Sequence, residues 1–317
     1  MIYEGGTKIE GIVCGDVDGD GEIEVLSLDQ TEGIIRLHKH PAANPTGTWT
    51  TISLQTSRLN LQDAQAIDID GDGRPEIVYT WEGNGTGSGG VNWLDYDGDG
   101  DVMDTDNWND YVMVQHEGSW WLASSQVDTS GSDNRVDLSG DTNDTDIVFS
   151  SRDNANPNAV PGIYWIEEPG TVTDPWTLHT IIATEVDWLQ CDIGDFSGNG
   201  PGKDVLSIDH TAELCWFDFS DSWAKHTLAL PAGTADCWNC RTMTVQSNGR
   251  DDIMLITEDG IYRYEWSGSA YVSTQICPLG YSHPMEDRII WHDLDGDSVD
   301  EGIIPDSGSN YIGWLDL

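Results

Sequence analysis

The chain has 317 residues, of which 57 are Asp or Glu and 13 are Lys or Arg, so its formal net charge is −44. Binding to phosphate needs a basic surface, and this balance excludes a nucleic-acid partner. No apolar run is long enough to span a bilayer, which argues against membrane insertion. The first residues show neither a basic nor an apolar leader region, so we expect no signal peptide in this chain.

An acidic loop at residues 16–24, which reads DVDGDGEIE, is the first informative feature along the chain. It returns at residues 68–76 as DIDGDGRPE and at residues 293–301 as DLDGDSVDE. Oxygen ligands at alternate positions around turn-forming glycines are what a hard cation such as Ca²⁺ requires. In each loop we expect four carboxylates and one main-chain carbonyl to bind calcium. The carbonyls are those of Glu22, Arg74 and Val299. The carboxylates are those of Asp16, Asp18, Asp20 and Glu24, then Asp68, Asp70, Asp72 and Glu76, then Asp293, Asp295, Asp297 and Glu301.

The segment 95–106 carries another acidic cluster, with EF-hand-like spacing and Gly100 at loop position six. No helix pair flanks it, so the pattern predicts a calcium loop without the EF-hand fold, built from Asp95, Asp97, Asp99, Asp101 and Asp106. Two further loops are degenerate, and the calcium ligands expected there are Asp137, Ser139, Asp141, Asn143 and Asp146, then Asp195, Ser197, Asn199 and Asp204. Residues 245–252 lack the first acids, so we expect no metal there. All the ions are expected to be structural.

The acid that closes each loop also opens a hydrophobic strand, and these acids recur roughly every 50 residues: Glu24, Glu76, Asp146, Asp204, Asp252 and Glu301. A second recurrent strand follows in each unit and a further one in most, with β-like alternation. Such a period is typical of propeller blades. The sequence therefore predicts an all-β fold: a single β-propeller domain over residues 1–317 with six four-stranded antiparallel blades, or seven as the alternative, and an insertion at about residues 95–117.

The calcium loops and the aromatic strand after them, with Trp93, Trp165, Trp216 and Trp314, resemble the FG-GAP/VCBS repeats of β-propellers, best known from integrin α-subunit heads. The Phe-Gly and Gly-Ala-Pro words of the integrin repeats are absent, which places the chain nearer the bacterial VCBS branch. The resemblance implies calcium at the blade loops and an extracellular or surface location. Because the family includes adhesins, lectins and polysaccharide-active enzymes, the fold does not determine the function.

Segments that lead into the first strand of each unit carry tryptophans next to polar residues, and we expect these segments to lie together on one face of the propeller. Trp188 and Trp238 lie one period apart, so we expect them at equivalent places, and with Trp121 and Arg288 they are candidates for stacking on and hydrogen-bonding a sugar. The alternative is that these tryptophans pack between blades. No nucleophile motif, HExxH or phosphate loop is present. We therefore predict no catalytic residues and no cofactor besides calcium, and we interpret the six cysteines as buried thiols or disulfides.

These observations favour an extracellular, calcium-stabilised binding or adhesion module whose partner is a glycan or a surface protein, and which is not an enzyme. Two alternatives stay open. One is a polysaccharide-active lyase or hydrolase, and the other is a structural subunit of a virion, appendage or surface layer that assembles with itself or with other subunits.

Overall fold

The computed structural model describes residues 8–42, 44, 46–56, 58–83, 89–98, 100–116, 119–122, 138, 146–151, 160–183, 188–199, 204–209, 213–234, 237–243, 249–278, 290–292, 301–306 and 311–315. The chain forms two compact units, Met1–Leu122 with Gln126–Glu185 and Ala123–Ser125 with Val186–Leu317. In the described ranges the regular elements are β-strands and two 3-10 turns, η1 (Thr105–Asn107) and η2 (Phe219–Asp221). None of these residues forms a helix that could cross a membrane.

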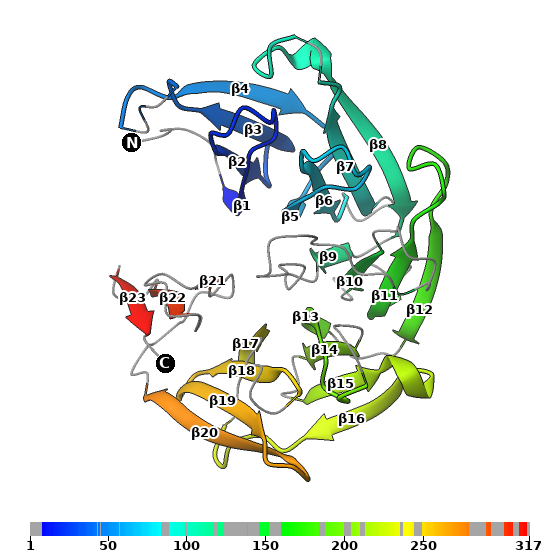
Figure 1. Cartoon of the computed structure of the whole chain (residues 1–317), viewed down its shortest axis with the longest axis vertical. Helices are drawn as coiled ribbons and strands as arrows, with labels where there is room; N and C mark the ends of the chain where they lie inside the picture. The colour runs from blue at the N-terminus through cyan, green and yellow to red at the C-terminus, as the bar shows by residue number, and fades with distance from the viewer. Residues whose placement is uncertain are drawn as a thin grey trace. The chain divides into compact units, whose positions relative to one another are not determined.

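The first unit contains three antiparallel sheets of four strands each, and the strands follow one another in chain order (Figure 1). The first sheet comprises β1 (Ile9–Gly15), β2 (Glu24–Asp29), β3 (Ile34–Lys39) and β4 (Thr50–Gln55). The second comprises β5 (Leu61–Ile67), β6 (Glu76–Trp81), β7 (Gly90–Tyr96) and β8 (Trp108–Gln115). The third comprises β9 (Ser119–Leu122), β10 (Ile147–Ser151), β11 (Gly162–Glu167) and β12 (Thr177–Ala183).

The second unit repeats this arrangement in two four-stranded sheets and one three-stranded sheet. The first of them comprises β13 (Trp188–Gly194), β14 (Asp204–Asp209), β15 (Leu214–Asp218) and β16 (Ala224–Leu228). The next comprises β17 (Cys237–Met243), β18 (Asp252–Thr257), β19 (Gly260–Trp266) and β20 (Tyr271–Pro278). The last comprises β21 (Ile290–His292), β22 (Glu301–Asp306) and β23 (Tyr311–Leu315). The predicted all-β class and antiparallel four-stranded sheets are confirmed, whereas the closure of a ring and the blade number stay predictions.

The predicted insertion at about residues 95–117 is too long. Strand β8 lies inside this range and pairs with β7 as the fourth strand of the second sheet, from Gly90↔Gln115 to Tyr96↔Trp108. The additional residues between the two strands are 97–107, which include η1. Most side chains of β8 are at least partly exposed, so its sequence lacks the hydrophobic alternation that revealed the other strands.

Burial differs systematically between the second and the fourth strand of a sheet. Every residue of β6, β14 and β18 is buried, which explains why their sequences are nearly continuous apolar runs. By contrast, β12 and β16 contain no buried residue. These second strands are therefore buried on both faces, whereas the fourth strands face solvent, and their exposed side chains include the apolar Val112, Leu178 and Val272.

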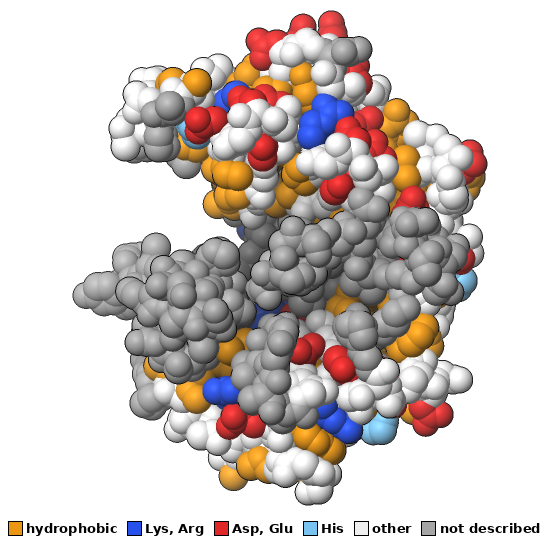
Figure 2. Space-filling view, viewed as in Figure 1, with side chains coloured by type: hydrophobic (Ala, Val, Ile, Leu, Met, Phe, Trp, Pro, Cys, Tyr) orange, Lys and Arg blue, Asp and Glu red, His pale blue; other side chains and the backbone are white. Residues whose placement is uncertain are grey.

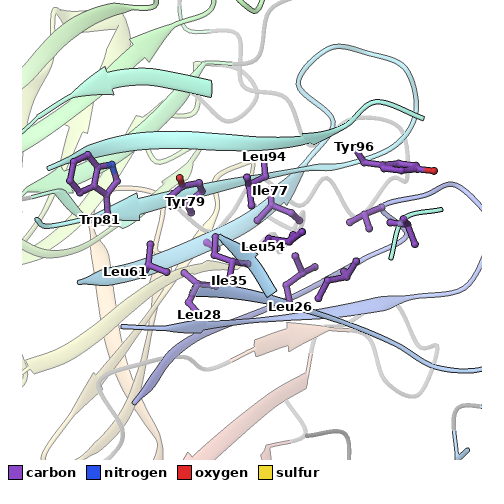
Figure 3. Close-up of a cluster of buried hydrophobic side chains, with 14 residues drawn as sticks. Leu26, Leu28, Ile35, Leu54, Leu61, Ile77, Tyr79, Trp81, Leu94 and Tyr96 are labelled. Atoms are coloured by element: carbon purple, nitrogen blue, oxygen red, sulfur yellow. The ribbon is translucent and has the colours of Figure 1, made fainter. Parts of the chain in front are cut away.

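The core of the first unit includes a cluster shared by its first two sheets. Figure 3 shows Leu26, Leu28 and Ile35 of the first sheet beside Leu61 and Ile77 of the second. All five side chains are fully buried. Complete burial of such a side chain stabilises the fold by about 1.5–3 kcal/mol, so this apolar contact fixes the two sheets against each other.

Aromatic pairs connect the third and fourth strands in the second, third and fourth sheets. Trp165 lies directly opposite His179, and Trp216 directly opposite His226; the rings of both pairs stack with an interplanar angle of 10° and centroids 4.0 and 4.1 Å apart. Trp93 stacks on Tyr111 at 4.6 Å. The three tryptophans are buried and belong to the core.

Candidate metal centre

The acidic loops at residues 16–24 (loop 1) and 68–76 (loop 2) connect the first and second strands of the first two sheets. Glycines at the fourth and sixth loop positions have positive φ, with values of 72° and 87° for Gly19 and Gly21. In loop 1 the N–H of Gly21 donates to Asp16 Oδ2 over 2.9 Å. The corresponding bond in loop 2 joins Gly73 N to Asp68 Oδ2 over 3.1 Å. The two loops therefore share one backbone conformation.

The second residue of each loop anchors it to the protein interior. Val17 and Ile69 are 1 % exposed, and their N–H groups donate to the closing carboxylates, Val17 to Glu24 Oε2 over 3.1 Å and Ile69 to Glu76 Oε2 over 2.6 Å. The same bond occurs in the third and fourth loops, from Leu138 to Asp146 and from Phe196 to Asp204. The same hydrogen bond therefore joins the closing acid to the apolar second residue in four loops.

Carboxylate oxygens converge in both loop 1 and loop 2. One oxygen from each of three acids lies within 4.8 Å of the other two, and the acids are Asp16, Asp18 and Glu24 in loop 1 and Asp68, Asp70 and Glu76 in loop 2. Glu24 is 0 % exposed and Glu76 is 4 % exposed. Oxygen-only groups of this kind match the preference of Ca²⁺ and other hard cations.

The electrostatics of loop 2 favour a bound cation. Burial, together with the charges of Asp70 and Asp68, raises the pKa of Glu76 to about 8. Burial and the charge of Asp70 also raise the pKa of Asp95 at the end of β7. Crowded, partly desolvated carboxylates repel one another unless a positive charge lies among them. The residues of loop 2 therefore fit a divalent cation.

Loop 1 already contains a positive charge, the Lys39 ammonium at the end of β3. Its Nζ donates to Asp18 Oδ2 over 2.5 Å, to Asp20 Oδ2 over 2.8 Å and to Glu24 Oε1 over 2.9 Å. Burial alone lowers the pKa of Lys39, but these three bonds outweigh it and raise that pKa. Asp16 Oδ1 is buried and has no hydrogen-bond partner among the described residues.

The fourth loop is held chiefly by backbone donors. Asp204 accepts N–H bonds from Phe196, Ser197 and Phe219, and Asp195 accepts one from Gly198 over 2.7 Å. Ser197 Oγ accepts the N–H of Asn199. These polar groups are at the predicted positions, but among the described residues they do not form a converging set of three acids.

Other predicted metal ligands are described in part or not at all. Asp97, Asp101 and Asp106 lie between β7 and β8, with Asp106 in η1, and Asp99 falls outside the described residues. The remaining ligands of the third loop and of the last loop also fall outside them: Asp137, Ser139, Asp141 and Asn143, then Asp293, Asp295, Asp297 and Val299. Of Glu301, the first residue of β22, only the backbone is described. Metal binding at these places stays a prediction.

The fifth loop, predicted to bind no metal, shows a different use of charge. The closing acid Asp252 accepts two hydrogen bonds at its Oδ2, one from Arg263 Nε over 2.8 Å and one from Arg263 Nη2 over 2.6 Å. Arg250 stacks on Trp266 with its guanidinium carbon 3.6 Å from the ring centroid. A side-chain cation therefore accompanies the closing acid in both loop 1 and loop 5, a feature that the acidic motif alone does not reveal.

The predicted sugar-contacting residues are placed only by their backbones. Trp121, Trp188 and Trp238 lie in β9, β13 and β17, and Arg288 falls outside the described residues. The predicted equivalence of Trp188 and Trp238 is wrong. Trp188 lies opposite Asp209 and Cys237 opposite Thr257, both at the end of the second strand, so Cys237 takes the place of Trp188.

All six cysteines have free thiols, and Cys191, Cys215, Cys237 and Cys240 are buried. Burial raises the pKa of the Cys240 thiol well above its usual range. Nucleophilic attack needs the thiolate, so burial makes this thiol unreactive. The interpretation as buried thiols is confirmed for these four cysteines.

Residues 16–79, which contain loops 1 and 2, match the model of the FG-GAP-like repeat family. This segment is an FG-GAP-like repeat, which confirms the resemblance predicted from its loops, while assignment to the VCBS branch stays a prediction. The curated proteins contain no match to the chain.

Solved structures with a similar fold cover nearly the whole chain. A candidate 6-phosphogluconolactonase from Bacteroides uniformis is 12% identical, with a TM-score of 0.59, over 98% of this chain and 82% of that one. Sqt1 from Saccharomyces cerevisiae is 10% identical, with a TM-score of 0.57, over 98% of this chain and 75% of that one. Both are propeller-like, and at these identities the similarity concerns the fold alone.

Proposed function

We propose that this protein is a calcium-stabilised β-propeller that acts as a binding module outside the cell. The observation that carries the proposal is the convergence of Asp68, Asp70 and Glu76 in loop 2, inside the segment that matches the FG-GAP-like repeat. Arg74 donates to Asp72 within this loop, and a further positive charge beside the buried Glu76 would relieve its repulsion by Asp70 and Asp68. A bound Ca²⁺ supplies that charge and joins the end of β5 to the start of β6.

The surface charge supports a choice among partners. Figure 2 shows Asp and Glu side chains on the described surface of both units, with few Lys or Arg side chains among them. With a net charge of −44, the protein repels polyanions over the distance set by salt screening. We therefore propose a neutral glycan, or a protein surface with a basic patch, as the partner, with the glycan as the first candidate.

An extracellular location is consistent with weak calcium loops. Extracellular calcium modules bind with dissociation constants of about 10⁻⁴–10⁻³ M, and a ligand that binds only the folded state stabilises it by an amount that grows with the logarithm of its concentration. Loops of this affinity would need calcium near or above about 10⁻³ M to be occupied, which favours a location outside the cell.

Two measurements test the proposal. First, thermal unfolding in 5–10 mM Ca²⁺ and in EDTA is expected to give a higher melting temperature with calcium; equal temperatures would contradict structural calcium. Second, calorimetric titration of the calcium-loaded protein with neutral and acidic polysaccharides is expected to give saturable heat with a neutral one. Continuous heat flow would indicate turnover and overturn the non-catalytic assignment, and silence across the panel would overturn the glycan partner.

A further inference from the structure

Lys39 makes loop 1 different from loop 2 although the two loop sequences are almost the same. The ammonium donates to Asp18, Asp20 and Glu24, three of the four carboxylates expected to bind the ion. An ammonium group has three donors and no acceptor, so these bonds use its full capacity. The Lys39 side chain is 19 % exposed, which shows that most of its length is packed against the protein.

The register of the sheets shows that this arrangement is special to the first sheet. Val25 pairs with His38, so the closing acid Glu24 faces Lys39. When each strand pair is extended by one residue in the same way, the residue that faces each of the next four closing acids is acidic: Asp95, Glu167, Asp218 and Glu265. Lys39 thus replaces a carboxylate with a cation at one recurring position.

Calcium and the Lys39 ammonium compete for the same oxygens. A divalent ion held by Asp18 and Glu24 would lie at short range from a like-charged group that those carboxylates already bind, and this repulsion opposes binding. In loop 2 the equivalent residue is Asp95, whose charge adds to the attraction for an ion. The difference in charge at this position is two units in favour of cation binding by loop 2.

We propose that the ammonium of Lys39 takes the place of calcium in loop 1, so that loop 1 closes without a metal ion while loop 2 binds one. The inference rests on the proposed role of calcium for loop 2 and goes beyond it for loop 1. Loop 5 offers a parallel within the same chain, because its closing acid Asp252 is bound by Arg263. Two of the five closing acids with a described side chain, Glu24 and Asp252, are thus bound by a side-chain cation.

The test is the number of calcium ions bound per chain, measured by equilibrium dialysis with radioactive Ca²⁺ on the full chain. Asp18→Asn and Asp70→Asn are a matched pair, since both change the third position of a loop. Asp70→Asn is expected to bind one ion fewer than the wild type, and Asp18→Asn the same number. Loss of one ion in Asp18→Asn would overturn the proposal, because loop 1 would then hold calcium.

A gain-of-binding variant gives the complementary result. Lys39→Asp restores the acidic residue found at this position in the next four sheets and is expected to bind one additional ion and to gain a calcium-dependent rise in melting temperature. A folded Lys39→Asp protein, verified by tryptophan fluorescence, that binds no additional ion would overturn the proposal. If this variant fails to fold, the Asp18→Asn count still decides. A wild type that binds no calcium at all would instead overturn the proposed function and the loop 2 half of the inference.

Discussion

Arg74 and Arg250 occupy the same position in their loops, two residues before the closing acid, and each reaches back to the preceding loop. A Cβ atom on Gly19 would lie 3.2 Å from Arg74 Cδ, and a Cβ on Gly198 would lie 3.1 Å from Arg250 Nε. Arg250 also donates to the carbonyl of Phe196 over 2.5 Å. The fourth loop position therefore has two reasons to be glycine: positive φ and an arginine against its face.

Substitutions in loop 1 separate these two reasons. Gly21→Ala meets only backbone strain, because nothing lies within 4 Å of the added Cβ, and we expect it to lower the free energy of unfolding by about 1 kcal/mol. Gly19→Ala adds the contact with Arg74, and we expect about 2 kcal/mol. Urea unfolding in EDTA measures both. Equal losses would show that the Arg74 side chain moves away from the added methyl group without a cost. In an Arg74→Ala background, the loss caused by Gly19→Ala should become smaller, whereas the loss caused by Gly21→Ala should stay the same.

Glu76→Gln should act in opposite directions with and without calcium. Without calcium, the pKa of about 8 means that at neutral pH Glu76 must either take up a proton on folding or stay charged among like charges. Glutamine avoids both costs, so we expect a melting temperature equal to or above that of the wild type. With calcium, it removes a ligand, so we expect the increase caused by calcium to shrink. Differential scanning calorimetry in EDTA and in calcium measures the difference in melting temperature between the variant and the wild type under each condition. Parallel shifts under both conditions would contradict a cation role for loop 2.

The stacked pair Trp216 and His226 should contribute through ring contact. His226→Ala is expected to lower the free energy of unfolding by about 0.5–1.5 kcal/mol beyond the lost area, and His226→Phe should restore most of it. A double-mutant cycle with Trp216→Leu isolates the pair, since the loss on His226→Ala should nearly vanish in that background. An unchanged loss would mean that His226 acts through other contacts.

His38 should make the first sheet sensitive to acid. Its ring is 2 % exposed and lies 2.9 Å from both Ser27 Oγ and Thr51 Oγ1. Burial, and then the charge of Arg36, lowers the pKa of His38 below 6.5. The unfolded chain therefore binds the proton more readily, and this contribution to stability is present above pH 6.5 and is lost as the pH falls towards the folded-state pKa. Urea unfolding from pH 7.5 to 5 should show a smaller decline in His38→Gln than in the wild type.

The sequence was sufficient for the strands whose side chains are buried on both faces. The acid-then-apolar runs that begin at Glu76, Asp204 and Asp252 predicted β6, β14 and β18, because full burial leaves an uninterrupted hydrophobic signal. The signal failed for β8, where exposed positions break the alternation, and the wide spacing between Glu76 and Asp146 suggested an insertion that included this strand.

The parts that the sequence could not predict depend on strand register. Lys39 belongs to loop 1 only because β3 pairs with β2 so that it faces Glu24, 15 residues away. Cys237, and not Trp238, matches Trp188 because the two first strands are offset by 49 residues, from Gly194 to Met243, and not by the 50 that separate the two tryptophans. A difference of one residue in the length of a unit cannot be read from the average period. A comparison of residues facing the closing acids would have singled out Lys39.

Every hydrogen-bonded strand pair in the described residues joins strands that are neighbours in sequence. Each sheet can consequently form from successive hairpins, which close on a microsecond scale, without waiting for distant segments to meet. Duplication or deletion of about 50 residues would add or remove a complete sheet and leave every other strand with its own partner. The architecture thus permits growth and loss by whole units during evolution.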